Sequence, residues 1–186
     1  MLALAFRRVN LTPLGVYVPA ARGVGGQVRA NVTATVDYAD RVTARVRGDV
    51  VGGRFALVDG DRTLLSLRRI DATGLDVQWP ERVAIAQVRL RQPSVLLERD
   101  REGRFPLLDR FAPAAAETTP ALATGEARPR VPPVVMVGEV VVENGSVVIV
   151  DHTAAATRVE VPRVDLTVRD ATWPKSSTPA RVALHA

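Results

Sequence analysis

The sequence predicts a mainly β protein, with a mostly antiparallel sheet and at most short helices. The chain contains 31 valines among 186 residues and few aromatic residues, and a branched Cβ favours strands over helices. Apolar and polar residues alternate in long runs, which is typical of strands with one buried and one wet face. Turn-forming residues recur about every ten positions, the spacing of an all-β meander.

The clearest strands are expected at Gln27–Tyr38 and Val42–Val50. Both alternate strictly, and Ala39-Asp40 between them predicts a turn, so the two runs should form an antiparallel hairpin. Residues 1–25 contain prolines and a glycine cluster that predict an irregular lead-in with at most one helical turn.

Shorter strands are expected after this hairpin, separated by turn signals at Gly52-Gly53, Asp59-Gly60-Asp61, Thr73-Gly74 and Pro80-Glu81. The expected strands are Arg54–Val58, Leu64–Ile70, Leu75–Trp79 and Val83–Leu90. No window shows a convincing helical stripe, and Leu107–Ala116 can hold at most a short helix.

A strand–break–strand unit occurs twice. Gln87–Phe105 contains a break at Pro93, and Glu139–His152 repeats its pattern with a break at Asn144-Gly145, a pair typical of hairpin turns. In this alignment Val88 matches Val140, Leu90 matches Val142, Ser94 matches Ser146 and Val95 matches Val147.

The repetition divides the chain into two β units. The first is expected over 1–110 and the second, truncated, over 134–186. Residues 111–133, rich in Ala, Pro and Thr, are expected to be a linker or insertion, because they lack the apolar surface to fold alone.

The net charge of +5 comes almost entirely from arginine, since Lys175 is the single lysine. Such a balance fits a surface for nucleic acid or anionic lipid, or else charges scattered over solvent-exposed faces. Acidic residues are interspersed and no basic run forms, which favours the second interpretation. Arg41, Arg45 and Arg47 share one strand face and are the best nucleic-acid candidate, but no nucleic-acid partner is expected.

No pattern of catalytic or metal-binding residues is evident. The chain has no cysteine, and His152 and His185 are isolated, whereas a metal site needs several ligands at suitable spacing. Asp59 and Asp61 lie in a predicted turn, and Asp151-His152 lacks a nucleophile in a strained turn. The sequence therefore predicts a non-enzymatic protein with no catalytic, cofactor-binding or metal site.

The order of these features resembles the AsmA-like superfamily of bacterial envelope proteins, specifically its large repeat-containing branch described as a domain of unknown function. The resemblance rests on Val88-x-Leu90-x-x-Pro93-x-Val95 followed by Arg99-Asp100 and Gly103-x-Phe105, and on Val140-x-Val142-x-x-Gly145-x-Val147-x-Ile149-x-Asp151. It continues through Val164-x-Leu166-x-Val168 to Pro179-Ala180-Arg181-Val182.

The resemblance implies an elongated, twisted sheet of repeated strand units that curls around an apolar groove. It also implies a periplasmic protein anchored to the inner membrane by an N-terminal helix, with a role in lipid transfer or outer-membrane assembly. Met1–Phe6 is apolar but too short to be such a helix, so the chain is expected to be an internal fragment whose membrane association comes from other parts.

We expect the groove to bind phospholipid acyl chains, because an aliphatic sheet face needs a partner. The residues expected to line it are Val28, Val32, Val36, Val42 and Val46. One alternative is that these valines pack in a sealed sandwich core. Another is a structural module that holds other envelope proteins through its strand edges without lipid.

Overall fold

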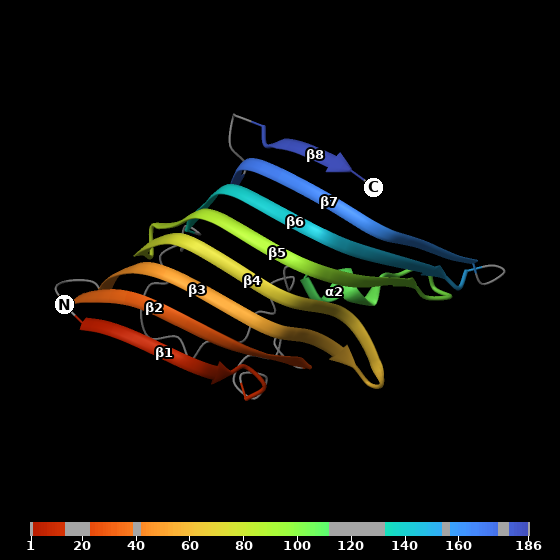
Figure 1. Ribbon diagram of the computed structural model, residues 1–186, viewed down its shortest axis with the longest axis horizontal. Helices are drawn as coiled ribbons and strands as arrows, with labels where there is room; N and C mark the ends of the chain where they lie inside the picture. Colours follow the sequence, from red (N-terminus) through yellow and green to blue (C-terminus); the bar gives the residue numbers. More distant parts are fainter. Residues whose placement is uncertain are drawn as a thin grey trace, which may run out of the picture.

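Alternating apolar and polar residues form long strands in the computed structural model, which describes residues 2–13, 23–38, 42–111, 133–153, 157–174 and 179–185. These residues contain one eight-stranded sheet whose strands lie side by side in chain order (Figure 1). The strands are β1 (Leu2–Asn10), β2 (Val24–Tyr38), β3 (Val42–Asp59), β4 (Arg62–Trp79), β5 (Arg82–Arg99), β6 (Val134–Asp151), β7 (Thr157–Trp173) and β8 (Arg181–His185).

All neighbouring strands pair antiparallel except β5 and β6, which are parallel. The connection between these two strands contains the short helix α2 (Pro106–Phe111). The predicted fold class, a twisted and mostly antiparallel sheet with at most short helices, is confirmed.

The sequence repeat is the register of the parallel pair. Val88 pairs with Val140, Leu90 with Val142 and Val95 with Val147, so equivalent positions of the two repeats lie directly beside each other. The side chains reinforce this register, because Gln87 Nε2 donates a 2.7 Å hydrogen bond to Glu139, 52 residues further along the chain.

Several predicted turns are wrong, because the chain passes through them as continuous strand. Gly52-Gly53 lies within β3, Thr73-Gly74 within β4, Pro93 within β5 and Asn144-Gly145 within β6. Pairing with neighbours continues on both sides of each break. At these positions the strands bend, and none of them reverses direction.

The bends line up across the sheet at two corners. At the first corner Arg54, Gln92 and Asn144 have positive φ values of 51°, 50° and 51° and lie near one another across β3 to β6. At the second corner Gly48 and Gly74 have positive φ values, and Gly74 faces Ala86, which in turn faces Gly138.

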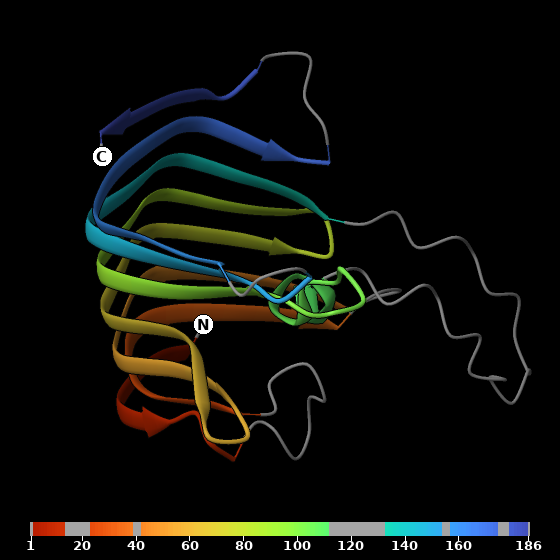
Figure 2. The ribbon, with the colours of Figure 1, turned by 90° about the vertical axis from the view of Figure 1, so that its right-hand side faces the viewer.

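The two corners fold the sheet into a trough, as Figure 2 shows. In β4 the successive residues Arg68 and Arg69 are both exposed, as are Thr73 and Gly74. The alternation of inward-facing and outward-facing side chains therefore shifts by one residue at each corner, as in a β-bulge. As a result, the apolar residues on either side of each corner stay on the same face of the sheet.

The N-terminal prediction also needs correction. Leu2–Asn10 is expected to be irregular, but it forms β1 and pairs with β2. Residues 2–10 contain no proline or glycine, so their backbone groups can pair with the edge of β2. The turn signals responsible for that expectation begin at Pro13.

Other predictions are confirmed. β2 and β3 form the expected antiparallel hairpin, and the chain turns at Gly60-Asp61 and at Pro80-Glu81. Helix α2 falls in the stretch where a short helix is expected. The Ala39-Asp40 turn and residues 112–132 of the predicted linker lie outside the described residues.

Helix α2 packs against the concave face of the sheet. Leu107 of α2 forms a buried cluster with Leu57 and Leu64, and Val95 and Leu97 of β5 pack against this cluster. In Figure 2 the helix lies in the mouth of the trough. The apolar face of the sheet is therefore the inner surface of the trough.

Candidate functional site

The inner surface of the trough is a continuous aliphatic surface. Directly opposite residues on paired strands share a face, so the register defines rows that cross the sheet. One such row is Val32, Gly48, Leu75, Ile85, Val137 and Ala171. A neighbouring row is Ala30, Val50, Ala72, Val88, Val140, Val168 and Val182. Neither row contains a charged or polar side chain.

The described residues cover this surface only in part. Among the described residues, only Leu57, Leu64, Leu67 and Leu107 are buried hydrophobic residues, and three of them form the cluster beneath α2. Most other inner positions are half-buried, and Val182 and Leu184 of the edge strand β8 are 66% and 60% exposed. The described strands form one sheet, not the two packed sheets of a sandwich.

Four of the five predicted groove residues lie on the inner face. Val28, Val32 and Val46 are half-buried there, and Val36 is exposed near the rim. Val42 pairs with Tyr38 at the end of the β2–β3 hairpin, but its side chain lies outside the described part of the structure. Their role in lining a lipid groove stays a prediction.

Two tryptophans mark one rim of the trough. Trp79 ends β4 opposite Ala44, and Trp173 ends β7 opposite Val135. Both positions belong to the inner face, yet the residues are 52% and 59% exposed. The sequence holds only these two tryptophans, so intrinsic fluorescence reports on the rim of the trough.

The outer surface carries paired charges. Asp76 forms ion pairs with Arg45 at 3.6 Å and Arg47 at 3.4 Å, and Arg69 donates two 2.9 Å hydrogen bonds to Asp71. Further pairs join Arg89 and Arg91 to Glu143, Glu139 to Arg169, and Arg163 to Asp165. Such exposed pairs each contribute little stability.

These pairs weaken the best nucleic-acid candidate. Arg45 and Arg47 share the carboxylate of Asp76, so part of their positive charge is neutralised on the protein itself. Arg41, the third member of that group, lies outside the described residues.

The charged turn after β5 has a structural explanation. The backbone N–H of Arg104 donates to Asp100 at 2.8 Å and, with the charge of Arg104, holds the pKa of Asp100 below its usual value. Asp151 accepts hydrogen bonds from the hydroxyl and the backbone N–H of Thr153, which lower its pKa in the same way. These carboxylates therefore cap turns.

His152 also lies beside a carboxylate that has a second partner. Its Nε2 lies 3.6 Å from Glu98, which also accepts a 2.7 Å hydrogen bond from Arg62. The Asp151-His152 sequence therefore places its two side chains against different partners. Among the described residues, no three His, Cys, Asp or Glu side chains lie together in a way that could hold a metal ion.

Comparison with known proteins adds no assignment. No family model, curated protein or solved structure matches this chain. In the part of the chain that the structure describes, no helix has the length and apolar character needed to cross a membrane.

Sequence reasoning missed one feature of the outer surface. A recess at the first corner is lined by residues of β2, β3 and β4, including Arg29, Arg54, Arg68 and Arg69. Its sequence signals are the adjacent pairs Gly52-Gly53 and Arg68-Arg69, but these lie on different strands, and only the register brings them together.

Proposed function

We propose that the trough binds the acyl chains of phospholipids, and that the protein is a non-enzymatic envelope module for lipid transfer or outer-membrane assembly. The observation that carries the proposal is the aliphatic inner surface, which runs across the sheet and remains half-exposed away from α2. Large exposed apolar surfaces mark binding sites. The AsmA-like sequence pattern points to the same class of function and to a periplasmic location.

Burial of the methylene groups of the acyl chains supplies the driving force for lipid binding. Each buried methylene contributes about 0.8 kcal/mol, so about ten would contribute roughly 8 kcal/mol before the entropic cost of ordering the chain. The inner rows consist largely of Val and Ala, whose side chains offer no hydrogen bonds to a ligand. This surface suits a flexible hydrocarbon and does not select a particular headgroup.

The test uses the two rim tryptophans as reporters. Phospholipid brominated along its acyl chains should quench the fluorescence of Trp79 and Trp173 in the wild-type protein. Val32→Asp places a charge on an inner row, at a position of β2 that is paired with both β1 and β3. Because an unpaired carboxylate is costly to bury in hydrocarbon, this variant should lose quenching and lipid co-purification while keeping its β circular dichroism spectrum.

Thr33→Asp is the matched control. Thr33 is the next residue of β2, faces outward and lies opposite Arg47, so it introduces the same charge on the other side of the sheet. It should bind lipid like the wild type. Equal quenching by all three proteins would contradict the proposal, as would unfolding of Val32→Asp, which indicates a sealed core.

A structural scaffold is the second candidate, favoured by the open ends of the sheet. The described strands end at β1 and β8 with no further strand paired to either, and such edges can pair with strands of other proteins. Native mass spectrometry separates the two functions. A scaffold would bind partner proteins and carry no lipid, whereas the trough would carry lipid without a protein partner.

A further inference from the structure

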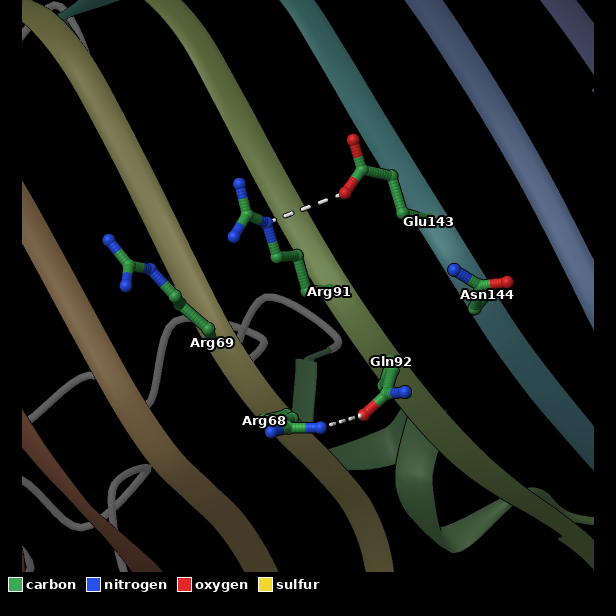
Figure 3. Close-up of a pocket in the computed structure, with 6 residues that line it drawn as sticks. All are labelled: Arg68, Arg69, Arg91, Gln92, Glu143 and Asn144. Carbon is green, nitrogen blue, oxygen red and sulfur yellow. Dashed lines mark hydrogen bonds and ion pairs between the residues drawn. The ribbon is translucent and has the colours of Figure 1, made fainter.

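The outer face of the first corner contains a recess rich in arginine. Two adjoining cavities of about 470 and 340 Å³ share Arg68 and Arg69 as lining residues. Figure 3 shows the second cavity, with side chains from β4, β5 and β6 on the face of the sheet turned away from α2. The corner explains this crowding, because Arg68 and Arg69 both point outward although they are successive residues of one strand.

The charge is concentrated in the larger cavity. Its lining contains Arg29, Arg54, Arg68 and Arg69, together with Gln27 and Gly52-Gly53, and none of the described residues that line it is acidic. Among these arginines Arg69 is paired with Asp71, and Arg68 donates to the neutral side chain of Gln92 at 3.1 Å. Within the described part of the chain, neither Arg29 nor Arg54 has an ion-pair partner.

This recess contrasts with the rest of the outer surface. The adjoining cavity contains Glu143, which pairs with Arg91 at 3.4 Å (Figure 3), and Arg45 and Arg47 share Asp76. Apart from Arg69, which pairs with Asp71, the guanidinium groups that line the larger cavity have no carboxylate partner among the described residues. Guanidinium groups match the planar, multidentate hydrogen bonding of a phosphate group.

We infer that the β2–β4 recess is a binding site for a phosphate group, held by Arg29, Arg54 and Arg68. Free phosphate and the headgroup of a phospholipid share this chemistry. The site lies on the opposite face of the sheet from the trough, so a lipid whose chains occupy the trough cannot place its own headgroup there. The inference therefore goes beyond the proposed function and does not depend on it.

The test titrates the isotope-labelled full chain with inorganic phosphate at constant ionic strength and follows amide and arginine Nε signals by NMR. The wild type should show saturable shifts centred on Arg54 and Gly53. Arg54→Gln and Arg29→Gln should each weaken binding about tenfold, the loss typical of one charge-assisted hydrogen bond. Arg158→Gln, which removes the same charge from an arginine paired with Glu160 on β7, should bind like the wild type.

A second variant blocks the recess without changing its charge. A Cβ at Gly53 would lie 3.7 Å from the nearest atom, the carbonyl oxygen of Arg68, so Gly53→Leu fits the backbone and places its side chain on the outer face. This variant should also lose the phosphate shifts.

Vesicles identify the source of the phosphate group. If phosphatidylglycerol vesicles bind in an Arg54-dependent manner and phosphatidylcholine vesicles do not, the ligand is an anionic headgroup. If only inorganic phosphate binds, it is a small phosphate. Two results would overturn the inference: no binding of either probe, or equal weakening by Arg158→Gln and Arg54→Gln. Val32→Asp should leave phosphate binding unchanged, which separates this site from the trough.

Discussion

At the residue scale, single backbone positions decide whether a strand of this sheet can bend. The second corner depends on small residues, because the strands approach closely there. A Cβ on Gly74 would lie 2.6 Å from the Cβ of Ala86, and a Cβ on Gly48 would overlap the carbonyl oxygen of Asn31. Gly48 also has a φ of 151°, which side-chain-bearing residues rarely adopt.

Gly48→Ala should therefore lower the free energy of unfolding by about 3 kcal/mol, through backbone strain and the clash with β2. Gly53→Ala is the control, since its Cβ meets nothing closer than 3.7 Å and its φ is not positive, and it should change stability by less than about 1 kcal/mol. Urea unfolding monitored by circular dichroism measures both values. Similar midpoints for the two variants would mean that the corner adjusts without cost.

Single charged residues also stabilise the bends of the strands. The backbone N–H of Asn144 donates to Asp165 at 2.7 Å and Arg163 pairs with the same carboxylate, so the pKa of Asp165 is lowered from its usual value. Asn144 is a corner residue with positive φ. The charge on β7 therefore helps to hold the bend of β6, which gives this carboxylate a structural role.

At the scale of elements, α2 is the one described helix on the inner face, and it occupies part of the trough. Leu107 is 6% exposed and packs on Leu57 and Leu64, whereas its neighbour Leu108 is 54% exposed. The helix is short, and most of the stability of a short helix comes from tertiary packing. A single side chain should therefore dominate its attachment to the sheet.

Leu107→Ala should destabilise the protein by about 2–4 kcal/mol, because it removes buried methyl groups and leaves a cavity. Leu108→Ala, which differs only in facing solvent, should cost less than about 0.5 kcal/mol. Thermal or urea unfolding distinguishes them. If both variants were equally stable, α2 would contribute no packing energy to the inner face.

At the scale of the whole molecule, contacts are almost entirely between adjacent strands. The substantial contacts among the described elements join neighbouring strands of the sheet, and the packing of α2 on the inner face is added to them. Such an array resembles a repeat protein, whose stability is approximately a sum over neighbouring units. The ends should then be less stable than the centre.

Native-state hydrogen exchange should reveal this gradient. Amides of β3, β4 and β5 should exchange most slowly, because each of these strands is paired on both sides and the buried leucine cluster lies over them. Amides of β8, a five-residue edge strand whose residues are all exposed, should exchange fastest, with opening free energies near zero. Uniform protection from β1 to β8 would instead indicate a single cooperative unit.

The sequence alone determined the fold class, the two faces of the alternating strands and the alignment of the repeats. Alternation placed Val28, Val32 and Val46 on one face, because side chains of a strand point to opposite sides in turn. The similarity of Gln87–Phe105 to Glu139–His152 became the register of β5 and β6, because equivalent strands side by side match apolar with apolar positions. The predicted trough lining follows from the same alternation.

Only the tertiary structure decided which breaks are bends and where the outer recess lies. Gly52-Gly53, Pro93 and Asn144-Gly145 suit a turn or a bulge equally well, since both require the same local backbone freedom. Pairing with strands on both sides keeps the chain extended through them. The arginines of the recess come from three strands, so they converge only after the register and the corner have placed them together.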